Sequence, residues 1–242
     1  LVAHFHNVII GGVLFGMFAA INYWYPKAFG YKLDEYWGKW SFWLWNVGFY
    51  AAFIPLYVLG LMGVTRRMNH FDDASLQIWF VIAAVGALLI FGGIIASIIQ
   101  FVVSYRRRDQ LRDLSGDIWN GRTLEWSTSS PPPQYNFAFT PVVYDNDAWT
   151  DMKKHGFERP RDGFLPIHMP KNTASGFVLA MLSAVCGFGL VWHMWPLAGA
   201  SFVALIAGVI LHTFNYNRDY HIPAEDVTRI EDERSQLLDR YA

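Results

Sequence analysis

The sequence is poor in cysteine and in charge. Cys186 is the only cysteine among 242 residues, so the chain cannot form an internal disulfide. It lies inside an apolar run and is interpreted as a small buried hydrophobic residue. Only 16% of the residues are charged, and the formal net charge is -1. Soluble domains carry about 25% charged residues. The near balance of charge provides no basic surface, so no nucleic-acid partner is expected.

The sequence also lacks a polar start. It begins at Leu1 without a methionine, and the apolar pattern is already under way there. No basic region or cleavage site typical of a signal peptide is present. We therefore expect this chain to be the C-terminal part of a longer polypeptide.

Apolar and aromatic residues are abundant, at 53% and 17% of the chain. A helix that crosses a bilayer core of about 30 Å needs about 20 apolar residues. Five segments meet this requirement, at about 1–23, 40–63, 76–105, 174–194 and 197–214. The sequence therefore predicts an all-α membrane protein with five transmembrane helices, of which the last two form a hairpin.

A polar stretch with several prolines separates the third and fourth segments. It contains the run SSPPP, whose three prolines favour polyproline geometry. We expect a stiff strap extended across the membrane surface; a ligand for a proline-reading domain is the alternative. The predicted parts are 1–105 for the first three helices, 106–173 for a cytoplasmic Pro-rich loop, 174–215 for the hairpin and 216–242 for a cytoplasmic tail.

Basic residues in short connections predict the orientation. They follow the first and third segments, at Lys27, Lys32, Lys39 and Arg106–Arg108. Connections rich in lysine and arginine face the cytoplasm, which places residue 1 near the periplasmic side and the C-terminus in the cytoplasm. The connection after the second segment then lies outside, although it carries Arg66 and Arg67. Two adjacent arginines on that side favour an anionic partner.

Two histidines, His4 and His6, stand at the head of the first segment. Because successive residues of an α-helix turn by about 100°, the two imidazoles point about 200° apart and cannot share one metal ion. They suit two separate ligands on opposite sides of the helix, such as two hemes. Arg66 and Arg67 fall on the same predicted side and can pair with heme propionates. The alternatives are interfacial histidines and a solvated basic turn.

Several motifs in this order resemble subunit I of the heme–copper terminal oxidases: HFHNVIIGG, YWYPKAFG, FIPLYVLGLMGVTRRM, GRTLEWSTSSPPPQYNF and IHMPKN. The resemblance covers residues 1–214 and is greatest to the cytochrome bo-type, quinol-oxidising branch. It implies that His4 is the axial ligand of high-spin heme o and that His6 is an axial ligand of low-spin heme b. It also implies that Arg66 and Arg67 contact heme propionates.

The same resemblance implies part of the catalytic subunit of a proton-pumping ubiquinol oxidase in the bacterial inner (plasma) membrane. In this family electrons pass from ubiquinol through low-spin heme b to a high-spin heme–copper centre that reduces oxygen to water. The copper ligands, the quinol site and the proton channels of the family lie outside this segment. The expected partners are therefore the remainder of subunit I, subunits II, III and IV, and the lipid membrane.

Six further histidines are dispersed and are interpreted as non-ligands: His70, His155, His168, His193, His212 and His221. The cytochrome c-oxidising branch of the family stays open as an alternative, because the sequence does not identify the electron donor. A different class also stays open, a proton-coupled transporter in which His4 and His6 relay protons and the arginines bind an anion. A noncatalytic assembly subunit is a third possibility.

Overall fold

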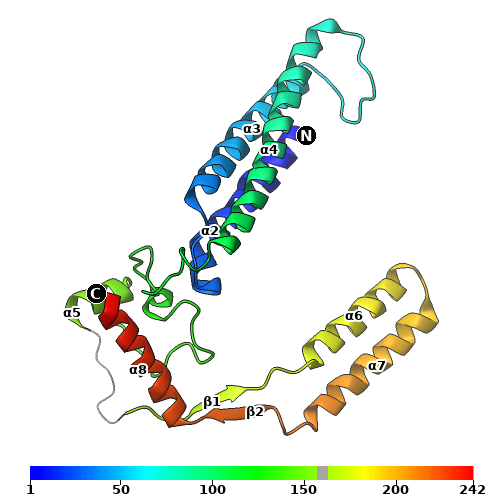
Figure 1. The fold of residues 1–242 in the computed structure, drawn as a ribbon. Helices are drawn as coiled ribbons and strands as arrows, with labels where there is room; N and C mark the ends of the chain where they lie inside the picture. The colour runs from blue at the N-terminus through cyan, green and yellow to red at the C-terminus, as the bar shows by residue number, and fades with distance from the viewer. Residues whose placement is uncertain (157–162, 242) are drawn as a thin grey trace. The chain divides into compact units, whose positions relative to one another are not determined.

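The computed structural model describes residues 1–156 and 163–241, which are mainly helical (Figure 1). The chain forms two compact units. The first is built on Leu1–Phe137 together with a short helix, α5 (Ala148–His155). The second contains two strands and two apolar helices, which are considered separately below.

A long helical rod opens the first unit and consists of α1 (Val2–His6), the π-helix η1 (Asn7–Leu14) and α2 (Phe15–Phe29). The rod ends at Gly30, whose φ of 78° is left-handed and whose N–H donates to the carbonyl of Pro26 at 2.8 Å. Glycine adopts this conformation without steric cost, so it terminates the helix.

Two further long helices pack beside each other, α3 (Glu35–Leu61) and α4 (Gln77–Arg106), with the short 3-10 helix η2 (Ala74–Leu76) before α4. Small residues allow this packing: a Cβ built on Gly86 would lie 2.2 Å from the backbone nitrogen of Ala52. Close backbone approach of this kind is typical of helix pairs in membranes.

The polar stretch after α4 folds back onto the connection between α2 and α3, whereas the sequence suggested a strap extended over a surface. The Lys32 N–H donates to the Leu111 carbonyl at 3.0 Å, and the Asp113 N–H donates to the Gly30 carbonyl at 2.8 Å. The stretch also forms the 3-10 helix η3 (Leu124–Ser127) and α5. We call residues 111–156 the folded loop.

In the second unit, α6 (Ser175–Val191) and α7 (Trp195–Thr213) pack side by side (Figure 1). Strand β1 (Ile167–Pro170) precedes this pair, and β2 (Asp219–Ile222) follows it; the two strands pair antiparallel. Helix α8 (Ala224–Tyr241) follows β2, and its residues up to Ser235 belong to this unit. The strands fall in segments for which we predicted a loop and a tail, so the described fold is mostly rather than wholly α-helical.

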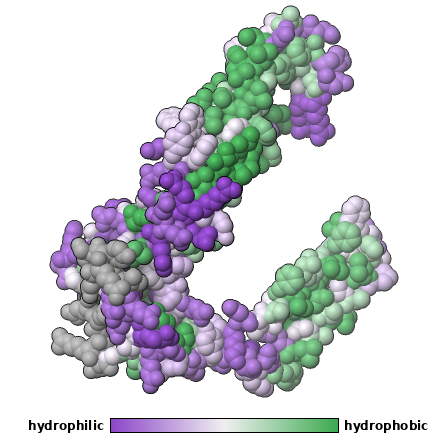
Figure 2. Space-filling view, viewed as in Figure 1, coloured by the Kyte–Doolittle hydropathy of each residue, from purple (hydrophilic) through white to green (hydrophobic). Residues whose placement is uncertain are grey.

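Among the described residues, four helices are long and apolar enough to cross a membrane: Val2–Phe29, Glu35–Leu61, Ala74–Arg106 and Trp195–Thr213. The remaining candidate, α6, has 17 residues. At 1.5 Å per residue it is about 26 Å long, a little short of the bilayer core. Apolar residues cover the long helices and polar residues gather on the loops (Figure 2). A helical membrane protein is thus supported, whereas the prediction of five crossings is not confirmed.

Candidate functional site

His6 is held in a defined orientation on α1. Its Nδ1 lies 2.9 Å from the carbonyl oxygen of Val2, and its ring stacks on Phe53 of α3 with centroids 4.8 Å apart and planes 16° apart. A carbonyl oxygen only accepts hydrogen bonds, so Nδ1 carries the proton and Nε2 keeps its lone pair. A histidine oriented in this way can offer Nε2 to a metal.

His4 lies on the same short helix, α1, two residues before His6. Its side chain is exposed, whereas that of His6 is half-buried. The α-helical geometry of Val2–His6 supports opposite directions for the two imidazoles. In residues 1–156 and 163–241, no three His, Cys, Asp or Glu residues are grouped to hold a metal ion.

A π-helix, η1, begins directly after His6. The Asn7 amide donates to the carbonyl of Ala3 at 3.0 Å, across the junction of α1 and η1. Short π-helical stretches within α-helices occur frequently at functional sites. Hydropathy does not reveal this change of winding, because η1 is as apolar as the helix around it; we did not predict it.

Arg66 and Arg67 lie on the loop after α3, and both are exposed. They line a cavity of about 570 Å³ together with Leu1 and Val2 at the start of α1. The structure therefore brings the arginine pair to the same end of the unit as the histidine helix. His4 and His6 are not among the residues that line this cavity. Neither guanidinium makes a hydrogen bond or ion pair within the described part of the chain.

The nearby acidic residue Asp73 is engaged elsewhere. Its Oδ1 accepts a hydrogen bond from the N–H of Ser75 at 2.9 Å and caps η2. Hydrogen bonds from the Ser75 side chain and backbone hold the pKa of Asp73 below its usual value. The carboxylate is thus charged at neutral pH and serves as the cap of η2.

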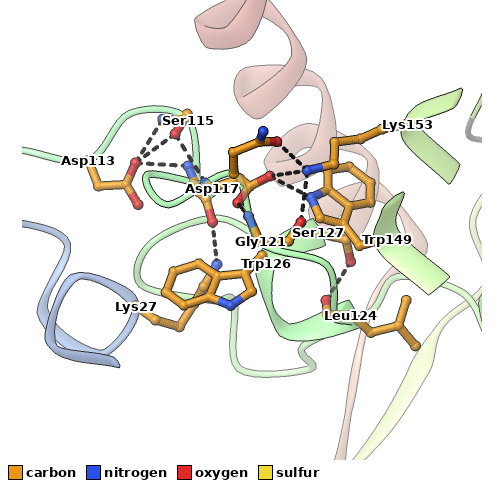
Figure 3. A network of polar contacts seen from close by, with 12 residues as sticks. Lys27, Asp113, Ser115, Asp117, Gly121, Leu124, Trp126, Ser127, Trp149 and Lys153 are labelled. Atoms are coloured by element: carbon orange, nitrogen blue, oxygen red, sulfur yellow. Dashed lines mark hydrogen bonds and ion pairs between the residues drawn. The ribbon is translucent and has the colours of Figure 1, made fainter. Parts of the chain in front are cut away.

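A second polar site lies at the opposite end of the rod, where the folded loop meets α2 (Figure 3). Lys27 is only 8% exposed. Its ammonium group donates to the carbonyls of Gly116 at 2.7 Å and Thr128 at 2.8 Å, and lies 5.2 Å from the centroid of the Trp126 ring. We used this lysine only as a signal of orientation; the structure shows that it also fixes the folded loop.

Asp117 organises the other half of this network (Figure 3). It accepts hydrogen bonds from Nε1 of Trp149 at 2.7 Å and from Nζ of Lys153 at 3.0 Å. Burial raises the pKa of Asp117, but hydrogen bonds from Gly121, Lys153 and Trp149 outweigh it and hold the pKa below its usual value. The charged groups of Lys27, Asp117 and Lys153 find their partners within the chain itself, so we interpret the network as structural. One atom of the network, Oδ2 of Asp113, is buried without a hydrogen-bond partner among the described residues.

Comparison with known proteins gives consistent results. Residues 1–89 match the family described as Cytochrome C and Quinol oxidase polypeptide I. Ubiquinol oxidase subunit 1 of Acetobacter aceti is 50% identical over 243 residues, which cover 98% of this chain and 37% of that protein. Cytochrome bo(3) ubiquinol oxidase subunit 1 of Buchnera aphidicola is 50% identical over 234 residues, or 96% of this chain and 35% of the relative.

A protein of Bradyrhizobium diazoefficiens named probable cytochrome c oxidase subunit 1 is 47% identical over 246 residues, covering 98% of this chain and 37% of that protein. The chain thus spans little more than a third of the length of these relatives. Its histidine and arginine pairs all fall within the matched residues 1–89. The chain belongs to the cytochrome c and quinol oxidase polypeptide I family, as a segment related to subunit 1.

Proposed function

We propose that this chain is the C-terminal part of the catalytic subunit I of a proton-pumping respiratory ubiquinol oxidase. The observation that carries the proposal is the state of His6, whose Nδ1 is occupied by a backbone carbonyl and whose Nε2 is left as a ligand atom. Its cofactors in this proposal are low-spin heme b, high-spin heme o and a copper ion whose ligands lie outside the segment.

The donor set fits heme. His6 offers one oriented nitrogen and His4 offers another on the opposite side of α1, so the two residues would each hold the iron of a separate heme. We assign His6 to low-spin heme b and His4 to high-spin heme o. When bound, the hemes and copper supply electron transfer and oxygen reduction. The contribution of α1 is to hold both axial imidazoles on one rigid element.

Arg66 and Arg67 are proposed to bind heme propionates. They are exposed, they line a cavity beside the start of α1, and guanidinium groups pair strongly with carboxylates. In this role their positive charge stabilises the propionates and raises the reduction potential of the nearby heme.

We further propose that α6 is a fifth membrane crossing, that residue 1 lies near the periplasmic side, and that the C-terminus is cytoplasmic. The remainder of subunit I, and subunits II, III and IV, are the proposed partners. The basic residues between the last turn of α2 and the first turns of α3, and those at the end of α4, support this orientation.

The test is the visible spectrum of the whole oxidase, purified from membranes, with substitutions in the complete subunit I. We expect His6→Ala to remove the low-spin heme bands and His4→Ala to remove the high-spin heme, because each loses an axial ligand. His70→Ala, in the exposed loop before η2, is the control and should keep both spectra. A colourless wild-type complex would instead support a transporter.

A cytochrome c oxidase is the second candidate, because the Bradyrhizobium relative carries that name. Oxygen consumption by the same preparation, with ubiquinol or with reduced cytochrome c as donor, separates the two. We expect turnover with ubiquinol; turnover with cytochrome c alone would assign the chain to the other branch.

A further inference from the structure

A second cavity, of about 290 Å³, lies among α2, α3 and α4, toward the end of the unit that carries the folded loop. Its walls include five polar side chains within otherwise apolar helices: Asn22, Ser41, Asn46, Ser97 and Gln100. Aromatic rings, among them Phe18 and Trp45, form much of the remainder. Of these five side chains, Ser41 and Gln100 are buried, and a buried polar group is costly unless it has a hydrogen-bond partner.

Some of these polar side chains form hydrogen bonds with one another. Gln100 is 4% exposed, and its Nε2 donates to Oδ1 of Asn22 at 3.0 Å and to the carbonyl of Asp34 at 3.2 Å. Ser97 donates to the carbonyl of Gly93 at 2.9 Å and lies 2.7 Å from the hydroxyl of Ser41. These bonds connect all three helices around the cavity.

Other polar groups around the cavity have hydrogen-bonding capacity that the described residues do not use. Trp45 is 7% exposed, and its Nε1 is buried without a hydrogen-bond partner in the described structure. An indole nitrogen only donates, so its missing partner must be an acceptor. The side-chain oxygens of Asn46 and Gln100 receive no hydrogen bond from the described residues, so they can accept one from an occupant of the cavity. An occupant that satisfies the lining must both donate and accept.

We propose that this cavity binds a cluster of ordered water molecules. Water both donates and accepts, and a buried water makes about three hydrogen bonds to otherwise unsatisfied groups. The cavity is large enough for several molecules, since each occupies about 30 Å³ in the liquid. An apolar side chain from another part of subunit I would leave the buried Nε1 of Trp45 unsatisfied, at a cost that water avoids. The site lies outside the proposed heme-binding end and does not depend on that assignment.

Radiolytic footprinting of the intact, purified oxidase tests the proposal. Brief X-ray exposure generates hydroxyl radicals from bound water, and mass spectrometry reports the oxidised side chains. We expect Trp45 to be oxidised clearly more than Trp126, which is also buried but whose Nε1 is bonded to the hydroxyl of Tyr23 at 3.0 Å. Equal, background oxidation of both tryptophans would mean that the cavity is dry and would overturn the proposal.

Two variants sharpen the measurement. Ala19→Leu places a larger side chain at a residue that lines the cavity, and it should abolish the oxidation of Trp45. Ala20→Leu adds the same side chain one residue along, outside the lining, and should leave the oxidation unchanged. Oxidation of Trp45 that persists in Ala19→Leu shows that radicals arrive from bulk solvent, which contradicts the proposal. Protection of Trp45 by added ubiquinone-1 would identify a quinone ring as the occupant and would also contradict it.

Discussion

At one end of the first unit, Lys27 and Asp117 are surrounded by hydrogen-bond partners from the folded loop. At the other end, Arg66 and Arg67 border a cavity and have no hydrogen-bond or ion-pair partner within the described residues. In the first arrangement Lys27 and Asp117 are bonded within the chain, whereas the second leaves two exposed guanidinium groups open to a further partner. Charged groups that the fold itself satisfies mark architecture, whereas those it positions and leaves available mark a binding site.

The largest expected effect is on the stability of the folded loop, which Lys27 contacts. Lys27→Met removes a buried ammonium and leaves the carbonyls of Gly116 and Thr128 without a donor. Since each hydrogen bond to a charged group contributes roughly 1.5–3 kcal/mol, we expect the folded loop to lose about 3 kcal/mol of stability. Limited proteolysis should then cut within 111–156 far more rapidly, while the heme spectrum is retained.

Lys32→Met is the matched control, because Lys32 forms a partly exposed ion pair with Glu35 at 3.0 Å. Such pairs contribute about 0–1 kcal/mol, so cleavage should change little. Equal cleavage in the two variants would show that Lys27 does not fix the loop.

A smaller effect depends on pH. The folded-state pKa of Asp117 lies below its ordinary value of 3.8, so its contribution to stability is present above pH 3.8 and is lost as the pH falls through the folded-state pKa. Pepsin cleavage within 111–156 should therefore accelerate as the pH is lowered below this value. Asp117→Asn should lose about 2 kcal/mol at neutral pH and remove this acid-dependent step. If the step persists in the variant, another carboxylate is responsible.

The smallest effect is expected at the arginine pair, on the midpoint potential of a heme. Arg66→Gln removes one positive charge from the proposed propionate site, which destabilises the reduced heme. A loss of about 1 kcal/mol corresponds to a midpoint potential lower by roughly 40 mV for one electron. Redox titration followed by absorbance measures this shift, and heme content should stay nearly constant. Arg106→Gln, at the end of α4, should leave the potential unchanged; an unchanged potential in Arg66→Gln would exclude the propionate role.

Hydropathy predicts the apolar centres of the long helices but not their ends. The first segment was expected to stop near Tyr23, yet the helix continues to Phe29, and α3 begins at Glu35 rather than near Trp40. These ends are set by local hydrogen bonds, such as the one from the N–H of Trp37 to the side chain of Asp34 at 3.0 Å. A pattern of apolar residues has no information about such caps.

For the candidate site, the residue types and spacing in HFH and TRR were enough to select four residues. That Arg66 and Arg67 line one cavity with the start of α1 required coordinates. The proton position on His6, which follows from its contact with Val2, required them too. The polar groups around Trp45 were missed because α2, α3 and α4 are so apolar that isolated Asn, Ser and Gln residues do not change the sequence pattern. Strands β1 and β2 were missed because each has only four residues.

The winding of η1 has a consequence for how mutations along the rod are interpreted. A π-helical turn contains more residues than an α-helical one, so residues after Leu14 are rotated relative to a helical wheel drawn from His6. An α-helical wheel that assigns the faces of α1 correctly therefore assigns the wrong faces to α2. Deleting one residue from Asn7–Leu14 rotates α2 by about 100° relative to α1. The side chains of α2 then face away from their present neighbours, although none of them has been changed.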